Sequence, residues 1–108
     1  MNDTMQELYD IVLSRKGIHT EGSYTCYLFD KGIDKILKKC GEECSEVIIA
    51  AKNGDNSETV LEISDLLYHL TVLMVNEGIS LDDVNAELAK RSEKSGNLKT
   101  FHQTNKNS

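Results

Sequence analysis

The sequence predicts an all-α fold: a single domain of four to five helices, with two long antiparallel helices at its centre. Apolar residues recur along most of the chain at the three- and four-residue spacing of amphipathic helices. No segment shows the sustained alternation of apolar and polar residues that is typical of strands. Proline is absent from all 108 residues, so glycines and capping residues are left to mark the helix ends.

The first two helices are delimited by capping residues and glycines. A capping box with Thr4 as N-cap and Glu7 three residues later opens the first helix, which we expect to end at about Arg15. A polar stretch follows. Ser23 is then a suitable N-cap for a short helix, and Gly32 is a suitable end for it.

Two longer helices are predicted to form the centre of the domain. The first covers residues 34–52, with Asp34 as its cap, and carries an apolar stripe along one side. The second covers residues 58–76 after an N-cap at Ser57. The turn between them is short, so the two helices should be antiparallel neighbours.

A final helix begins at a second capping box, residues 80–83, and should run to about Arg91. The residues that follow are nearly all polar. We therefore expect a helical domain over residues 1–92 and a flexible tail over residues 93–108.

Composition excludes several classes of function and favours self-association. The net charge of −6 argues against a nucleic-acid-binding protein. No apolar run is long enough for a membrane span, and the polar, acidic N-terminus is unlike a targeting peptide, so a cytoplasmic protein is expected. Only 39% of the residues are hydrophobic, yet the helix predicted over residues 58–76 is apolar around most of its circumference. A small core and an apolar helix together favour a helical-bundle homodimer.

Acidic residues recur at three-residue spacing on both central helices. Glu43 and Glu46 share one face of the first, and Glu42 borders them. Taken alone, these three residues fit a solvated helix face. Glu62 and Asp65 on the second helix are harder to explain, because leucines and valines flank them and burial of an unpaired carboxylate is costly.

Four carboxylates that converge between two antiparallel helices would form a site made of oxygen ligands only. Such ligands suit Mg²⁺ or Mn²⁺ rather than Zn²⁺. Mg²⁺ that is held by carboxylates and water commonly binds the phosphates of a substrate. His69 follows Asp65 by four residues, which predicts a structural hydrogen bond between their side chains.

The order E-x-x-E, fifteen intervening residues and E-x-x-D resembles the all-α nucleoside triphosphate pyrophosphohydrolases, which include MazG-like enzymes and dimeric dUTPases. The surrounding residues narrow the resemblance to the phosphoribosyl-ATP pyrophosphatases of histidine biosynthesis. These are Ser23-Tyr24-Thr25, Lys38-Lys39-x-Gly41-Glu42-Glu43-x-x-Glu46 and Glu62-x-x-Asp65-Leu66-x-Tyr68-His69.

The resemblance implies a helical homodimer that hydrolyses phosphoribosyl-ATP to phosphoribosyl-AMP and pyrophosphate, the second step of histidine biosynthesis. It also implies dependence on Mg²⁺, with Mn²⁺ as a substitute. The metal ligands that carry over are Glu43, Glu46, Glu62 and Asp65. The residue that positions or deprotonates the attacking water is left open between Glu46 and Glu42.

Four further residues are candidates for substrate binding. Lys35, Lys38 and Lys39 carry the positive charge that phosphates require, although they could equally balance nearby acidic residues. Tyr24 is a candidate for packing against the adenine or the ribose, with a place in the core as its alternative.

Two other functions stay open from the sequence. A house-cleaning pyrophosphohydrolase that acts on dUTP, dCTP or a damaged nucleotide would share the fold and the metal site. A non-catalytic helical interaction module would instead use the acidic residues in salt bridges with lysines.

Overall fold

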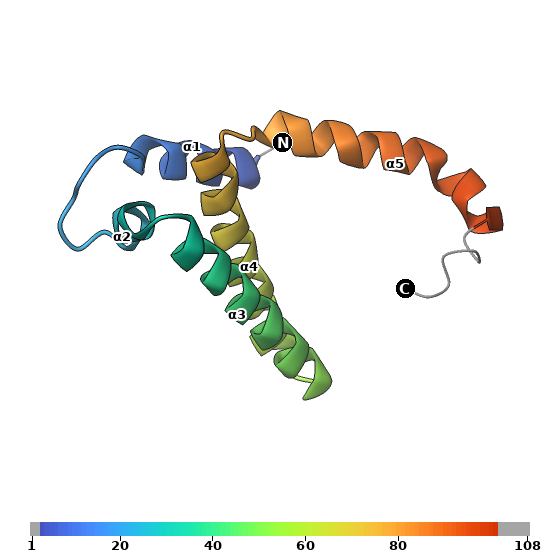
Figure 1. The fold of residues 1–108 in the computed structure, drawn as a ribbon. Helices are drawn as coiled ribbons and strands as arrows, with labels where there is room; N and C mark the ends of the chain where they lie inside the picture. Colours follow the sequence, from blue (N-terminus) through green and yellow to red (C-terminus); the bar gives the residue numbers. More distant parts are fainter. Residues whose placement is uncertain (1–2, 102–108) are drawn as a thin grey trace.

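The computed structural model describes the backbone of residues 3–101 and the side chains of residues 3–93. Five helices and no strand are found in this part of the chain, which confirms the all-α prediction. The helices are α1 (Thr4–Arg15), α2 (Tyr24–Lys31), α3 (Ile33–Lys52), α4 (Asn56–Glu77) and α5 (Leu81–Phe101) (Figure 1). None of the helices described is long and apolar enough to cross a membrane.

The N-terminal caps of the first two helices were predicted with mixed success. The cap of α1 is Asp3, whose carboxylate accepts a hydrogen bond from the backbone N–H of Gln6 at 3.1 Å. The prediction of Thr4 as N-cap was wrong by one residue, because aspartate is at least as good a cap and lies just before it. Ser23 caps α2 as predicted, with its hydroxyl accepting from the backbone N–H of Cys26.

The two central helices also begin slightly earlier than predicted. α3 follows Gly32, whose φ of 90° lets the chain turn sharply between α2 and α3, and Asp34 lies within the first turn of α3 instead of capping it. α4 is capped by Asp55, which accepts from the backbone N–H of Glu58 at 3.0 Å, and not by Ser57. The carboxylate of Asp55 therefore adds two residues to the start of α4.

One hydrophobic core joins the first four helices. Its buried side chains come from α1, α2, α3 and α4, and they are Val12, Leu28, Ile36, Cys40, Val72 and Val75. α1 is further tied to the end of α4 by two hydrogen bonds. The hydroxyl of Tyr9 donates to the carbonyl of Ile79 at 2.7 Å, and the ammonium of Lys16 donates to the carbonyl of Val75 at 3.2 Å.

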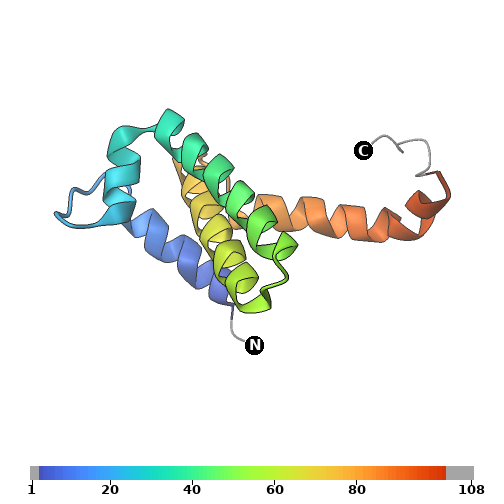
Figure 2. The ribbon, with the colours of Figure 1, turned by 90° about the horizontal axis from the view of Figure 1, so that it is seen from below.

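α5 projects away from the other four helices in both ribbon views (Figures 1 and 2). The radius of gyration is 16.5 Å, against about 13 Å for a compact chain of this length. The capping box predicted at its start is present, since the Ser80 hydroxyl and the Asp83 carboxylate each accept from the other residue's backbone N–H. α5 continues past Arg91, where the sequence predicted its end, to Phe101. The rest of the predicted tail, residues 102–108, lies outside the described part of the chain.

α4 is not fully buried, although its sequence is apolar around most of its circumference. Four of its apolar side chains, Val60, Leu61, Ile63 and Leu67, are 62%, 59%, 42% and 41% exposed. Val60, Ile63 and Leu67 follow one another at helical spacing on one side of α4. Leu70 and Met74 continue this row, and we call the five residues the apolar side of α4.

Candidate metal centre

α3 and α4 form an antiparallel pair that lies side by side in both views (Figures 1 and 2). A turn of three residues joins them, and Gly54 within it has a φ of 74°. The tight turn holds the two helices in contact along their length. Carboxylates that face inward from α3 and from α4 are therefore held next to each other.

Three of the four predicted ligands come together across this helix pair. Each of Glu43, Glu62 and Asp65 offers a carboxylate oxygen, and these oxygens all lie within 4.8 Å of one another. Glu43 and Glu62 are half-buried, while Asp65 is exposed. We call these three residues the acidic group. Its oxygen-only ligands and its opening to solvent fit Mg²⁺, which keeps several waters when it is bound by carboxylates.

Neighbouring glutamates raise the pKa of Glu62, one of the three carboxylates of the acidic group. The pKa of this carboxyl is raised from 4.5 to about 7. The largest cause is a hydrogen bond with Glu58, followed by desolvation and by the negative charges of Glu46, Glu58 and Glu43. A divalent cation would favour the ionised form of every one of these carboxylates. The residues present therefore suit a cation, and this is the observation that supports a metal here.

The structure separates Glu46 and Glu42 from the acidic group. Glu46 is exposed and is not one of the three clustered carboxylates, although its charge contributes to the raised pKa of Glu62. Glu42 is also exposed, and one of its oxygens lies 3.3 Å from the ammonium of Lys39. Of these two glutamates, Glu46 is the one whose negative charge contributes to the raised pKa of Glu62.

Lys39 is the predicted phosphate-binding lysine that lies closest to the acidic group. Its ammonium is 3.3 Å from an oxygen of Glu42 and 3.9 Å from an oxygen of Glu43. The hydrogen bond with Glu42 is the main cause of its raised pKa. Lys35 is half-buried and Lys38 is exposed, both earlier in α3. Helical spacing puts Lys35 on the same face as Lys39, one turn before it.

Tyr24 lies at the Lys39 end of the acidic group, within a cluster of aromatic rings. Its ring centroid is 6.0 Å from that of Tyr27, 6.2 Å from that of Tyr68 and 5.7 Å from that of His69. Desolvation raises the pKa of its hydroxyl, while the nearby charge of Lys39 lowers it and that of Glu43 raises it. Tyr24 is nevertheless 44% exposed, so it is accessible from the solvent side of the site.

The predicted hydrogen bond between Asp65 and His69 uses a different acceptor. The Nδ1 atom of His69 lies 2.8 Å from the backbone carbonyl of Asp65, not from its carboxylate. The side chain of Asp65 is therefore left for the acidic group. On its other side the His69 ring bonds to the hydroxyl of Tyr24 at 3.0 Å. The neighbouring pair, Thr25 and Tyr68, also joins α2 to α4 through their hydroxyls.

Glu58 is a residue near the site that the sequence analysis did not single out. It occupies the first turn of α4 and raises the pKa of Glu62 through a hydrogen bond. The signal was available in the sequence, because Glu58 precedes Glu62 by four residues. It was missed because a glutamate in the first helical turn is common for the helix dipole alone.

Comparisons with known proteins agree with the resemblance that the sequence motifs suggested. The family described as phosphoribosyl-ATP pyrophosphohydrolase matches residues 5–92 of the chain. A phosphoribosyl-ATP pyrophosphatase from Clostridium botulinum is 55% identical over 95% of this chain and 94% of its own. One from Lactiplantibacillus plantarum is 54% identical over 88% of this chain and 90% of its own. A histidine biosynthesis bifunctional protein from Thermoanaerobacter pseudethanolicus is 61% identical over 77% of this chain and 38% of its own.

Proposed function

The chain belongs to the phosphoribosyl-ATP pyrophosphohydrolase family, and we propose that the acidic group between α3 and α4 is the Mg²⁺ site of its reaction. The enzyme hydrolyses phosphoribosyl-ATP to phosphoribosyl-AMP and pyrophosphate, a step of histidine biosynthesis. The observation that carries the metal assignment is the convergence of carboxylate oxygens of Glu43, Glu62 and Asp65 within 4.8 Å of one another.

Each carboxylate in the site has a separate role in this proposal. Glu43, Glu62 and Asp65 hold Mg²⁺, and Mn²⁺ can take its place because both are hard cations that accept oxygen ligands. The metal would supply Lewis acidity to the phosphate oxygens and orient the triphosphate. Glu46 lies outside the acidic group but close enough to affect Glu62. We assign it to orient the attacking water and to accept its proton, with Glu42 as the alternative.

Lys39 and Tyr24 are proposed to bind the substrate beside the metal. The ammonium of Lys39 already lies between two glutamates, Glu42 and Glu43. A phosphate of the substrate can replace Glu42 as its ion-pair partner. Lys35, one turn earlier on the same face, can extend the positive charge along the triphosphate, and exposed Lys38 adds to it. Tyr24 is exposed at the same end of the site and suits the nucleoside part of the substrate.

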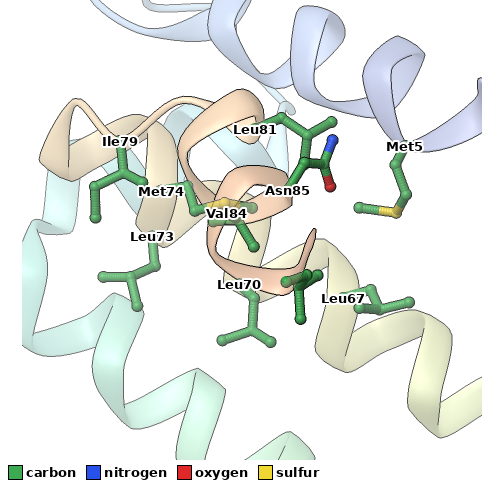
Figure 3. Close-up of a pocket in the computed structure, with 10 residues that line it drawn as sticks. Met5, Leu67, Leu70, Leu73, Met74, Ile79, Leu81, Val84 and Asn85 are labelled. Carbon is green, nitrogen blue, oxygen red and sulfur yellow. The ribbon is translucent and has the colours of Figure 1, made fainter. Parts of the chain in front are cut away.

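We further propose that the protein is a homodimer that covers the apolar side of α4. This row of side chains leads into an apolar groove of about 400 Å³ between α4 and the start of α5. Figure 3 shows side chains that line the groove, among them Leu67, Leu70 and Met74 of α4 and Leu81 and Val84 of α5. Leu88 of α5, 58% exposed, lies at the same groove. An isolated helix that projects into water is marginally stable, so a second copy packed here would stabilise α5 as well.

The substrate is tested by incubating the purified protein with Mg²⁺ and each of phosphoribosyl-ATP, dUTP, dCTP and ATP. We expect pyrophosphate release from phosphoribosyl-ATP alone, and complete loss of that release with EDTA. Release from a deoxynucleotide instead would assign the protein to the house-cleaning enzymes. Release that persists with EDTA would contradict the metal assignment, and no release from any of the four would favour the interaction module.

A further inference from the structure

His69 is buried, with 5% of its surface exposed, and both of its ring nitrogens have a hydrogen-bond partner. Nδ1 faces the backbone carbonyl of Asp65 at 2.8 Å. A carbonyl oxygen can only accept, so Nδ1 must carry a proton. When the ring is neutral, this is its one N–H, and Nε2 is left with a lone pair and no proton.

The direction of the next hydrogen bond follows from this tautomer. The hydroxyl of Tyr24 lies 3.0 Å from Nε2 of His69. Because Nε2 can only accept, Tyr24 must donate its single proton to it. The hydroxyl oxygen of Tyr24 then has lone pairs left and nothing further to donate.

Tyr24 lies beside the candidate site and is open to solvent. Tyr24 is 44% exposed and lies near Lys39 and Glu43, at one end of the acidic group. Lys39 is the neighbouring cation, and one of the three N–H donors of its ammonium bonds to Glu42. A bound nucleotide would therefore meet an oxygen that accepts hydrogen bonds but offers none.

We propose that Tyr24 presents its hydroxyl to the substrate as an obligate hydrogen-bond acceptor, and that His69 is the positioning residue that imposes this polarity. This inference rests on the proposed function. Tyr24 accordingly recognises a hydrogen-bond donor on the nucleoside part of the substrate, either a ribose hydroxyl or the exocyclic nitrogen of the base. It does not bind phosphate oxygens, which are acceptors themselves.

The tautomer is tested first, by ¹⁵N NMR of the metal-free protein with labelled histidine. The His69→Gln variant assigns the signal. We expect His69 as a neutral ring with its proton on Nδ1. A proton on Nε2, or on both nitrogens, would overturn the inference. This readout needs no substrate, so it stands even if the proposed function fails.

The recognition is tested by kinetics of the Tyr24→Phe variant. One lost hydrogen bond should raise KM for phosphoribosyl-ATP by about 2- to 13-fold and leave kcat nearly unchanged. Tyr9→Phe is the matched control, because it also removes one hydrogen bond that a tyrosine hydroxyl donates. Tyr9 lies on α1, and its hydroxyl donates to the carbonyl of Ile79. We expect this control to keep the wild-type KM. A Tyr24→Phe enzyme with unchanged KM, or with the same KM as Tyr9→Phe, would overturn the inference.

Substrate analogues then identify the donor. The KM penalty of Tyr24→Phe should vanish for the one analogue that lacks the contacted group, either a deoxyribose form or a form with an oxo group in place of the exocyclic nitrogen. Inhibition by pyrophosphate, which offers only phosphate oxygens to Tyr24, should be equal in wild type and variant. Weaker inhibition of the variant, or a penalty that persists for every analogue, would overturn the inference.

Discussion

The two sides of α4 differ in what they lack. On one side Glu62 and Asp65 meet Glu43 of α3, and these three clustered carboxylates lack a bridging cation. On the other side Val60, Ile63 and Leu67 are 62%, 42% and 41% exposed, and the surface lacks an apolar cover. At 100° per residue the two sides are about 150° apart around the helix.

A single helix can therefore serve two unrelated requirements when they occupy separate sides. A cation would satisfy the first requirement and a second copy of the chain would satisfy the second. Because the two sides share only the backbone of α4, a substitution on one should leave the other largely intact. The following predictions use that separation.

The largest effect is expected from Leu67→Asp on the apolar side. In a dimer this substitution removes one buried leucine from each copy, which is about 3–6 kcal/mol in total, or about a 10²–10⁴-fold weaker association. Sedimentation should then show the 12.1 kDa monomer. In a protein that is already a monomer, the same surface substitution would change the free energy of unfolding by less than about 0.5 kcal/mol. A wild-type protein that sediments as a monomer would contradict the proposed dimer.

On the acidic side, Asp65→Ala and Glu46→Ala should each lower turnover of phosphoribosyl-ATP by about 10²–10³-fold, because several kcal/mol of charge stabilisation are lost. The helical circular dichroism should be unchanged. Glu87→Gln is a matched control, since Glu87 is an exposed glutamate on α5 that pairs with Arg91. Near-normal turnover in both site variants would remove them from the mechanism.

Lys39→Gln should raise KM by about tenfold, because one charge-assisted contact to a phosphate is lost. The effect on unfolding should be small, since the ion pairs of Lys39 are partly exposed. Lys90→Gln on α5 provides the control for loss of charge. An equal KM for both variants would mean that Lys39 only balances the charge of nearby acidic residues and does not bind phosphate.

Glu62 should make the metal-free protein less stable as the pH rises. Its pKa of about 7 exceeds the ordinary value of 4.5, so the folded protein holds this proton more tightly than the unfolded chain does. The free energy of unfolding should fall as the pH rises from about 4.5 to about 7, and Glu62 should cause no further fall above that. Urea unfolding in EDTA at several pH values measures how steeply the free energy of unfolding falls with pH. Glu62→Gln should make this fall less steep. An equally steep fall in the wild type and the variant would contradict a raised pKa at Glu62.

The smallest effect is expected from Ser80→Ala, which removes the cap of α5. The cost should be about 1 kcal/mol of stability, seen as a lower Tm. Activity should stay at the wild-type level, because α5 projects away from α3 and α4, the two helices that carry the acidic group (Figure 1). Loss of turnover without loss of stability would link α5 to the site.

Local signals predicted the fold well, because helix ends depend on neighbouring residues. Ser23 and the box at Ser80 act as caps as predicted. Errors arose where two suitable caps were close together, as with Asp3 and Thr4 or Asp55 and Ser57, and the earlier residue formed the bond. α5 extends past Arg91 although its later sequence is polar, and helical periodicity alone could not reveal this.

The site was predictable where its residues repeat at helical spacing. The three-residue intervals pointed to Glu43, Glu62 and Asp65, which the structure brings together. The roles of Glu46, Lys35 and Lys38 stay predictions. The hydrogen bond between Tyr24 and His69 could not be foreseen, because it joins residues 45 positions apart in the sequence and depends on how α2 packs on α4.

The apolar circumference of α4 indicated a surface that one small chain cannot cover, which is why the sequence analysis favoured a homodimer. In the structure Val72 and Val75 are buried, while Val60, Ile63 and Leu67 are exposed. The sequence alone does not identify which surface would cover these exposed side chains.

The central claim is that the acidic group binds Mg²⁺, and thermal unfolding with and without Mg²⁺ tests it most directly. A cation that binds only the folded protein stabilises it by about 2.7 kcal/mol at a hundred times its Kd, which should raise the Tm by several degrees. The wild-type protein should show this rise. The Glu62→Gln, Asp65→Asn double variant should not. An equal rise in the two proteins, or no rise in the wild type at saturating Mg²⁺, would contradict the account.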